Sequence, residues 1–294
     1  MHVSQEHAIK LPDAILEKNG QYSDDTQLTR ETLLAVMQSG LNQDVFATRL
    51  AMQFQPGAPL IVGYGSTTLR SALRIRNGAS REESGVRDTI GNGSAMRSAV
   101  LGLLCKEQDD IVRVASEWSR VSHASPSTMA GASIMALAAR FVAGTGSSPF
   151  DVRSFFAYLV AATDFVPFRD LLGVVYEHVY EKSDTDVVVE RLKRFAEMHG
   201  ESYRADRMAA QVLQTVAYAL YCFAACPDDY MECIRLCLHP GGDVDTIAAM
   251  AGALCGTRVG VNGIPLAIRN AINDRGSFGC TQLASIAKQA FHRR

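Results

Sequence analysis

The sequence predicts an all-α fold. Apolar residues recur at three- and four-residue spacing through most of the chain, which is the period of an amphipathic helix. No run alternates with the two-residue period of a strand, and no short-period repeat is present. With 294 residues, of which 47% are hydrophobic, the chain can bury a large core as one large domain or two ordinary ones.

The periodic segments place the expected helices in chain order. They cover residues 28–37, 94–104, 111–121, 129–142, 155–162, 171–179, 209–225, 230–238, 247–259 and 283–291. The breaks between them contain Gly and Pro and are too short for a flexible interdomain linker. Residues 74–88 are polar and charge-rich, which is typical of a solvated loop or helix face; a loop that flanks a functional site is the alternative.

Two helices are built largely of small residues. Residues 130–139 read AGASIMALAA and residues 246–256 read TIAAMAGALCG. Because small side chains let helix axes approach closely, we expect both helices to be central and buried on most sides.

The net charge and the composition of two segments argue against several classes of partner. The net charge is -2, so no broad electrostatic surface for nucleic acid or for an anionic membrane is expected. Residues 1–10 lack the apolar core of a signal peptide, and the apolar stretch 209–226 carries Gln211, Gln214 and Thr215, which favours a buried helix over a membrane span. We therefore expect a cytoplasmic protein with no membrane partner.

The seven cysteines fit a reducing compartment. Two pairs, Cys222 with Cys226 and Cys233 with Cys237, have the i,i+4 spacing that places both thiols on one helix face. Packing of small residues in the core is the favoured interpretation, and a site for a soft metal is the alternative.

Two acidic clusters each precede an expected helix. The first is Ser23-Asp24-Asp25-Thr26 and the second is Gly241-Gly242-Asp243-Val244-Asp245-Thr246. A helix N-cap explains one such residue, but paired carboxylates repel each other, and a hard cation with oxygen ligands would relieve that repulsion. Neither cluster has the His/Cys spacing of zinc sites.

Two further segments hold candidate ligand-binding residues. Gly91-Asn92-Gly93-Ser94 opens an expected helix, where glycines and free backbone N–H groups suit a phosphate, although Asn-Gly is also a common turn. His123 lies in Ser122-His123-Ala124-Ser125-Pro126, before a buried helix. A lone His in that position is more often a capping or packing residue than a catalyst.

The order of these four segments resembles the motif series of the ADP-ribosylglycohydrolase family. The matching strings are SDDTQLT, GNGSAMR, SHASP followed by AGA, and HPGGDVDTIAAMAGALCG, between about residues 22 and 260. The resemblance implies one all-α domain over residues 1–294, a multi-helix orthogonal bundle with two divalent cations, Mg²⁺ or Mn²⁺, in a central cleft. It also implies a hydrolase that releases ADP-ribose from an ADP-ribosylated protein or other acceptor.

The resemblance assigns roles residue by residue. It implies metal ligation by Ser23, Asp24, Asp25, Asp243, Asp245 and Thr246, with Asp245 between the two ions and with Asp24, Asp25 and Asp245 as the catalytic set. It implies ADP-ribose contacts from Gly91, Asn92, Gly93, Ser94, Met96 and His123. Asp88 is a candidate general base, with a plain loop carboxylate as the favoured interpretation.

One departure concerns the amino-terminal region, residues 1–22. The family's usual GDALG helix is absent from it, and Glu6, Asp13 and Glu17 are its only acidic residues. This departure favours the alternative function, a non-catalytic ADP-ribose-binding or protein-binding member of the same fold. A helical metal-dependent phosphohydrolase is disfavoured, because only His123 and His239 lie near the motifs.

Overall fold

The computed structural model describes residues 20–58, 61–105, 107 and 110–293. Within these residues the secondary structure is helical, and β pairing is limited to isolated bridges between single residues. The prediction of an all-α fold is therefore confirmed. The divergent region 1–22 falls almost entirely outside the described residues.

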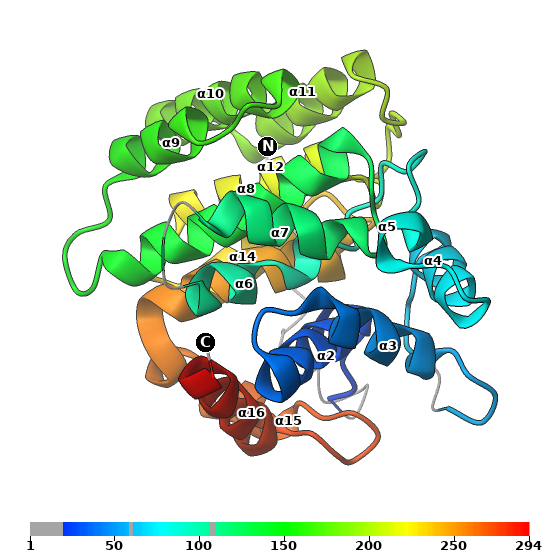
Figure 1. The fold of residues 1–294 in the computed structure, drawn as a ribbon. Coiled ribbons are helices and arrows are strands. Elements are labelled where there is room, and N and C mark those ends of the chain that lie inside the picture. The colour runs from blue at the N-terminus through cyan, green and yellow to red at the C-terminus, as the bar shows by residue number, and fades with distance from the viewer. Residues whose placement is uncertain (1–19, 59–60, 106, 108–109, 294) are drawn as a thin grey trace.

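The helices form three tiers (Figure 1). The central tier holds η2 (Ala95–Arg97), α6 (Ala99–Leu104), α7 (Asp110–Arg120), α8 (Pro126–Gly144), α12 (Val212–Ala225), α13 (Tyr230–Cys237) and α14 (Val244–Gly263). One outer tier holds α9 (Val152–Ala161), α10 (Val166–Glu181) and α11 (Thr185–Met198). The other holds α2 (Asp24–Ser39), α3 (Gln43–Gln53), α15 (Leu266–Ala271) and α16 (Cys280–Arg293), with α4 (Ser66–Arg76) and α5 (Arg81–Ser84) at one end.

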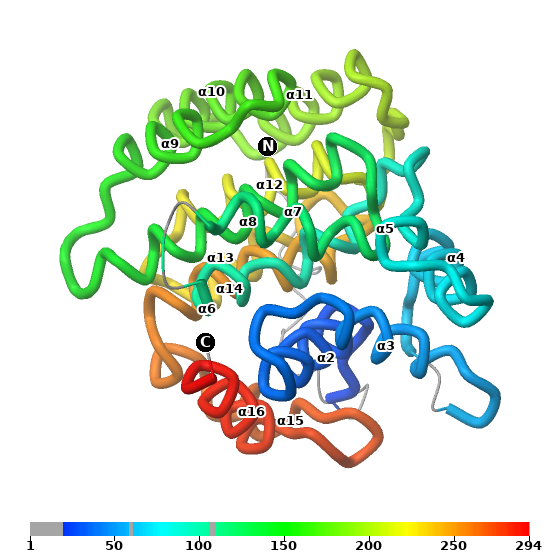
Figure 2. Tube along the Cα trace, viewed as in Figure 1, coloured from blue at the N-terminus to red at the C-terminus, as the bar shows by residue number. Residues whose placement is uncertain are grey.

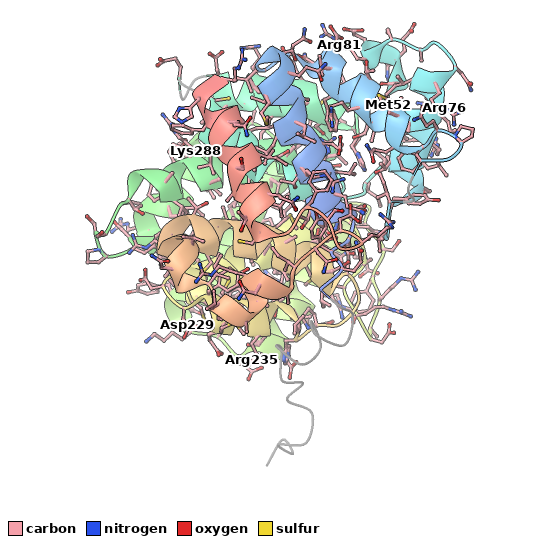
Figure 3. The ribbon with its side chains drawn as sticks, turned by 90° about the horizontal axis from the view of Figure 1, so that it is seen from below. Met52, Arg76, Arg81, Asp229, Arg235 and Lys288 are labelled. Carbon is pink, nitrogen blue, oxygen red and sulfur yellow. The ribbon has the colours of Figure 1, made fainter. Side chains whose placement is uncertain are left out.

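The two ends of the described chain meet in the lower tier. Helix α16 packs beside α2, and Figure 3, seen from below, shows these two helices next to each other with Lys288 on the outer side of α16. The backbone N–H of Asn273 donates to the carbonyl of Gly20, and the N–H of Tyr22 donates to the carbonyl of Asn273 in return. The residues just before the first acidic cluster are therefore hydrogen-bonded to the carboxyl-terminal part of the chain.

Every helix predicted from the periodicity contains observed helix, but one is broken and five were missed. Residues 94–104 form the short 3₁₀ turn η2 and then α6, rather than one continuous helix. The missed helices are α3, α4, α5, α11 and α15. Helices α3, α4, α5 and α15 bury at most four side chains each, so their apolar stripes are too narrow to be read from spacing.

The two small-residue helices differ in burial. Most of α8 is buried, as predicted, and its backbone lies against α6 so closely that a Cβ on Gly102 would stand 1.8 Å from the carbonyl oxygen of Ala136. The prediction for α14 was wrong on one face. Ala248, Ala249 and Ala253 line an open apolar groove between α14, α2 and α16, because no described element covers that side of α14.

Length and composition alone would allow two helices, α8 and α14, to cross a membrane. In the fold both belong to the central tier, and 61% of the apolar window of α8 is buried among other helices. Most of the segment 209–226, considered above for its apolar length, forms the buried helix α12; Gln211 is its N-cap residue, and Gln214 and Thr215 are buried within it.

The contact between α6 and α8 generates a stability prediction. We expect Gly102→Ala to lower the free energy of unfolding by at least about 2 kcal/mol, because the added methyl group must push two helix backbones apart. The measurement is urea unfolding. Gly173→Ala is the matched control: Gly173 lies within α10 with no neighbouring atom near its Cβ position, so that variant should be neutral or slightly more stable. Equal stability of the two variants would contradict the close contact.

Candidate functional site

The first acidic cluster forms the start of α2 and is buried. Ser23 is the N-cap residue, and its hydroxyl donates to Asp25 Oδ2 at 2.7 Å rather than capping the helix. The backbone N–H of Asp24 donates to the carbonyl of Val62 at 2.7 Å, which ties the helix start to the loop before α4. Asp24 and Asp25 are only 8% and 3% exposed.

The second acidic cluster forms the start of α14. Gly242 has a φ of 82°, and a Cβ there would lie 2.0 Å from the carbonyl oxygen of Met208, so only glycine fits the turn. Asp243, the N-cap residue, donates its backbone N–H to that same carbonyl. The Thr246 hydroxyl donates to Asp243 Oδ1 at 3.3 Å, whereas Asp245 in the first turn is exposed.

The fold brings the two clusters together, because α2 and α14 are in contact (Figure 2). Desolvation raises the pKa of Asp24 to about 7, and repulsion from Asp245 and Asp243 adds to the rise. Burial also raises the pKa of Asp25 to about 7, again with contributions from Asp24, Asp245 and Asp243. The pKa of Asp243 is raised by burial and by Asp245. Four carboxyl groups therefore repel one another across two helix starts.

The donor set suits a hard cation, but the side chains do not already enclose one. Asp25 Oδ1 is buried with no hydrogen-bond partner, which leaves an oxygen free for a ligand. Carboxylate and hydroxyl oxygens are the ligands that Mg²⁺ and Mn²⁺ take. In the described part of the chain, however, no three Asp, Glu, His or Cys side chains are arranged as ligands around one point. A cation would have to draw these carboxylates closer.

The Gly-Asn-Gly segment lies against the second cluster. Asn92 Nδ2 donates to Asp243 Oδ2 at 2.5 Å and also lies 3.2 Å from Thr215 Oγ1 on α12. Gly91 N–H is bonded to the Thr89 hydroxyl, whereas those of Gly93 and Ser94 find no acceptor among the described residues. Since η2 has only three residues, these free N–H groups, and not a long helix dipole, would meet an anion.

His123 faces this loop. A Cβ on Gly93 would lie 2.9 Å from His123 Cε1, and one on Gly91 would lie 3.6 Å from His123 Nε2. Burial, with the charge of Arg97 as the second cause, lowers the pKa of His123 to about 3, so the ring is neutral. Two other predicted residues are buried: the Ser94 hydroxyl donates to the Thr128 carbonyl, and Met96 lines the groove that reaches Asp25.

Several other candidates lie outside this cluster. Asp88 is 78% exposed at its side chain and pairs with Arg70, as expected of a loop carboxylate. Glu6, Asp13 and Glu17 are outside the described residues. Cys222, Cys233 and Cys237 are fully buried in the core, and no soft-metal ligand set occurs in the chain as described.

The sequence did not indicate which residues, distant along the chain, hydrogen-bond to the site residues and hold them in place. Thr215, Val62 and Met208 hold Asn92, Asp24 and Asp243 through one hydroxyl and two backbone carbonyls. A carbonyl leaves no signature in the sequence, and Thr215 reads as one more residue of a buried helix. Arg97 lies within the GNGSAMR motif, but nothing in its spacing indicated that it is buried and that no carboxylate among the described residues pairs with it.

Comparison with known proteins identifies relatives over nearly the whole chain. ADP-ribosylhydrolase ARH3 of Homo sapiens is 26% identical over 278 residues, covering 83% of this chain and 72% of that protein. The uncharacterized protein YegU of Escherichia coli K12 is 26% identical over 282 residues, covering 89% of this chain and 72% of its own. A solved structure, the ADP-ribosylglycohydrolase-related protein complex, has the same fold, with a TM-score of 0.68 at 21% identity over 93% of this chain and 82% of that one.

The sequence model of the family described as ADP-ribosylglycohydrolase matches residues 3–294. The match extends beyond the four motifs at both ends and includes most of the divergent amino-terminal region. Together with the order of the motifs and the all-α fold, it establishes that this chain belongs to the ADP-ribosylglycohydrolase family.

Proposed function

We propose that this protein is a divalent-metal-dependent hydrolase that releases ADP-ribose from an ADP-ribosylated acceptor. The observation that carries the proposal is the meeting of Asp24 and Asp25 with Asp243 and Asp245 beside the Asn92 loop, where the pKa values of Asp24, Asp25 and Asp243 are raised. Family membership and the similarity to ADP-ribosylhydrolases support the substrate class.

The acidic residues of the site would bind the cations. Asp24, Asp25, Asp243 and Asp245 would hold two cations, with Ser23 and Thr246 as hydroxyl donors to the same cluster. Bound Mg²⁺ or Mn²⁺ would supply positive charge that orients the ribose hydroxyls and activates water. Asn92 fixes the orientation of Asp243 through its 2.5 Å hydrogen bond, which holds that carboxylate against the Gly91–Gly93 loop.

The opposite side of the site would hold the anionic part of the substrate. The free N–H groups of Gly93 and Ser94 suit the pyrophosphate, and the neutral ring of His123 offers a hydrogen bond without adding charge. Cleavage at the anomeric carbon passes through an oxocarbenium-like ribose, which the surrounding carboxylates would stabilise. No covalent nucleophile is required for this reaction.

A non-catalytic binding protein of the same fold is the second candidate, and the divergent start of the chain favours it. The deciding experiment is incubation of the full chain with arginine-, serine- and nucleic-acid-linked ADP-ribose, with and without a chelator. Release of free ADP-ribose that the chelator abolishes supports the hydrolase. Binding of ADP-ribose with no release from any linkage would establish the binding protein instead.

Asp245→Asn should reduce turnover at least about a hundredfold, because a charge central to the cation cluster is lost from the transition state. Steady-state release of ADP-ribose is the measurement. Asp88→Asn is the matched control: its carboxylate is exposed and paired with Arg70, so turnover should stay within about twofold. An Asp245→Asn enzyme as active as the control would remove Asp245 from the catalytic set.

Added Mg²⁺ or Mn²⁺ should raise the melting temperature by about 5 °C or more at saturation, since a ligand that binds only the folded state stabilises it. The relief of carboxylate repulsion should make this effect pH-dependent. The pKa values of Asp24 and Asp25 are raised in the fold to about 7, so the metal-free protein loses stability as the pH rises from about 4 to 7.

Cation binding needs both carboxyls ionised, so it should release protons at pH 6 and hardly any at pH 8. Calorimetry in two buffers of different ionisation enthalpy measures that release. Asp25→Asn should reduce the proton release at pH 6. The same proton release at both pH values would place the cation elsewhere.

Gly93→Val should weaken ADP-ribose binding about tenfold or more, because its Cβ would stand 2.9 Å from His123 Cε1 and would displace the ring that faces this loop. Titration calorimetry with ADP-ribose gives the affinity. Gly144→Val, at the exposed end of α8 where φ is not positive and no atom lies near the Cβ position, is the control for the added side chain. Equal affinity of Gly93→Val and the wild type would move the phosphate site away from this loop.

A further inference from the structure

We propose that Arg97 and Ser122 are positioning residues that hold the neutral imidazole of His123 as its Nε2–H tautomer and aim that donor at the Gly91–Gly93 loop. The inference rests on the proposed function only in naming the acceptor, an oxygen of bound ADP-ribose. Its structural part concerns three buried side chains from η2 and from the loop between α7 and α8, none of which the acidic clusters require.

The three side chains form one hydrogen-bonded row. Arg97 Nη2 donates to Ser122 Oγ at 2.8 Å, and Ser122 Oγ lies 2.8 Å from His123 Nδ1. All three residues are at most 2% exposed. Arg97 stacks on the ring of Phe46 at 4.5 Å, and no carboxylate among the described residues pairs with it. Its charge therefore acts on Ser122 without being neutralised.

The number of protons on each group determines which group donates and which accepts in each of these hydrogen bonds. A serine hydroxyl has one proton and two lone pairs, and a guanidinium can only donate. Ser122 Oγ has no partner among the described residues except Arg97 and His123. If His123 carried its proton on Nδ1, the hydroxyl would accept twice and its own proton would be buried without an acceptor, which is costly. With the proton on Nε2, the hydroxyl accepts from Arg97 and donates to Nδ1, so that both Ser122 Oγ and His123 Nδ1 are satisfied.

The backbone holds this arrangement in place. His123 N–H donates to the Ser119 carbonyl at 2.7 Å, and the Ser119 hydroxyl donates to the His123 carbonyl at 2.8 Å. Val86 N–H donates to the Ser122 carbonyl, and Ala124 N–H donates to the Val86 carbonyl. These bonds hold the backbone from which the Ser122 and His123 side chains project, and the hydrogen bond between Ser122 Oγ and His123 Nδ1 then orients the ring.

The other nitrogen of the ring faces the ligand loop. A Cβ on Gly93 would lie 3.0 Å from His123 Nε2, and one on Gly91 would lie 3.6 Å from it. No described residue offers Nε2 a hydrogen-bond acceptor. The ring also stays neutral across the physiological range, because burial and the nearby guanidinium lower its pKa to about 3. A neutral donor without a protein acceptor is left for a substrate oxygen.

The test is long-range ¹H–¹⁵N NMR of the full chain labelled at histidine, with no metal or ADP-ribose present. His123→Asn identifies which of the seven signals belongs to His123. At pH 7 we expect the pattern of the Nε2–H tautomer. A pattern of the Nδ1–H tautomer, of a mixture, or of a charged ring overturns the inference, whatever the protein binds.

Three variants separate positioning from general stability. Ser122→Ala should give a tautomer mixture and weaken ADP-ribose binding about tenfold, which corresponds to about 1.4 kcal/mol. Ser122→Thr keeps a hydroxyl and should retain the wild-type tautomer and affinity. Ser119→Ala removes a neighbouring buried hydroxyl that touches only the His123 carbonyl, so it should leave the tautomer unchanged.

The outcomes distinguish this inference from the proposed function. An unchanged tautomer in Ser122→Ala, an equal change in Ser119→Ala, or a tautomer mixture without loss of affinity each overturns the inference. A wild-type protein that shows the Nε2–H tautomer and loses it in Ser122→Ala, yet does not bind ADP-ribose, leaves the positioning role established and refutes the proposed function.

Discussion

The repulsion among the acidic residues at the starts of α2 and α14 is the constraint on which the site depends. A helix start tolerates negative charge, but burial raises the pKa values of Asp24, Asp25 and Asp243 and so makes these three carboxyls harder to ionise. Backbone hydrogen bonds help to keep the two helix starts in place: the N–H of Asp24 donates to the carbonyl of Val62, and the N–H of Asp243 donates to the carbonyl of Met208. The chain and these hydrogen bonds thus hold the carboxylates near one another despite their mutual repulsion. A cation bound between the carboxylates would attract all of them.

The helical framework explains how that arrangement is held. Small residues let α6 and α8 approach until no Cβ fits at Gly102, and a single hydrophobic cluster extends from Leu28 on α2 to Ala290 on α16. A rigid core of this kind cannot relax locally to separate two charged loops. The small residues on the open face of α14 instead border an apolar groove of about 560 Å³ that reaches Asp25.

The side of the site proposed to bind the ligand relies on uncharged hydrogen-bond donors and not on charged groups. There the important groups are backbone N–H donors of Gly93 and Ser94 and a neutral imidazole, all uncharged. Asn92 joins the two sides, because one amide group contacts Asp243 of the acidic cluster and Thr215 of the buried helix α12. A protein that placed cations on one side and a diphosphate on the other would need such a link to hold the two at a fixed separation.

The sequence by itself determined the all-α class, the order of most helices and the family, because helical periodicity and the four motifs are local patterns. It also identified the carboxylates that meet, since acidic residues in pairs before apolar helices are unusual enough to be read from spacing. Short helices such as α3 and α15 escaped it, because few of their side chains are buried. The continuous helix expected over residues 94–104 is interrupted after η2.

Only the tertiary structure decided which groups face one another. Contacts between residues more than a hundred positions apart, such as Asn92 with Asp243, depend on how α12 and α14 pack and have no local signature. The exposed position of Asp88 and the open face of α14 were settled in the same way, by what the rest of the chain covers. The role of Arg97 depends on the absence of a carboxylate beside it in the described fold, and a sequence motif contains no information about distant partners.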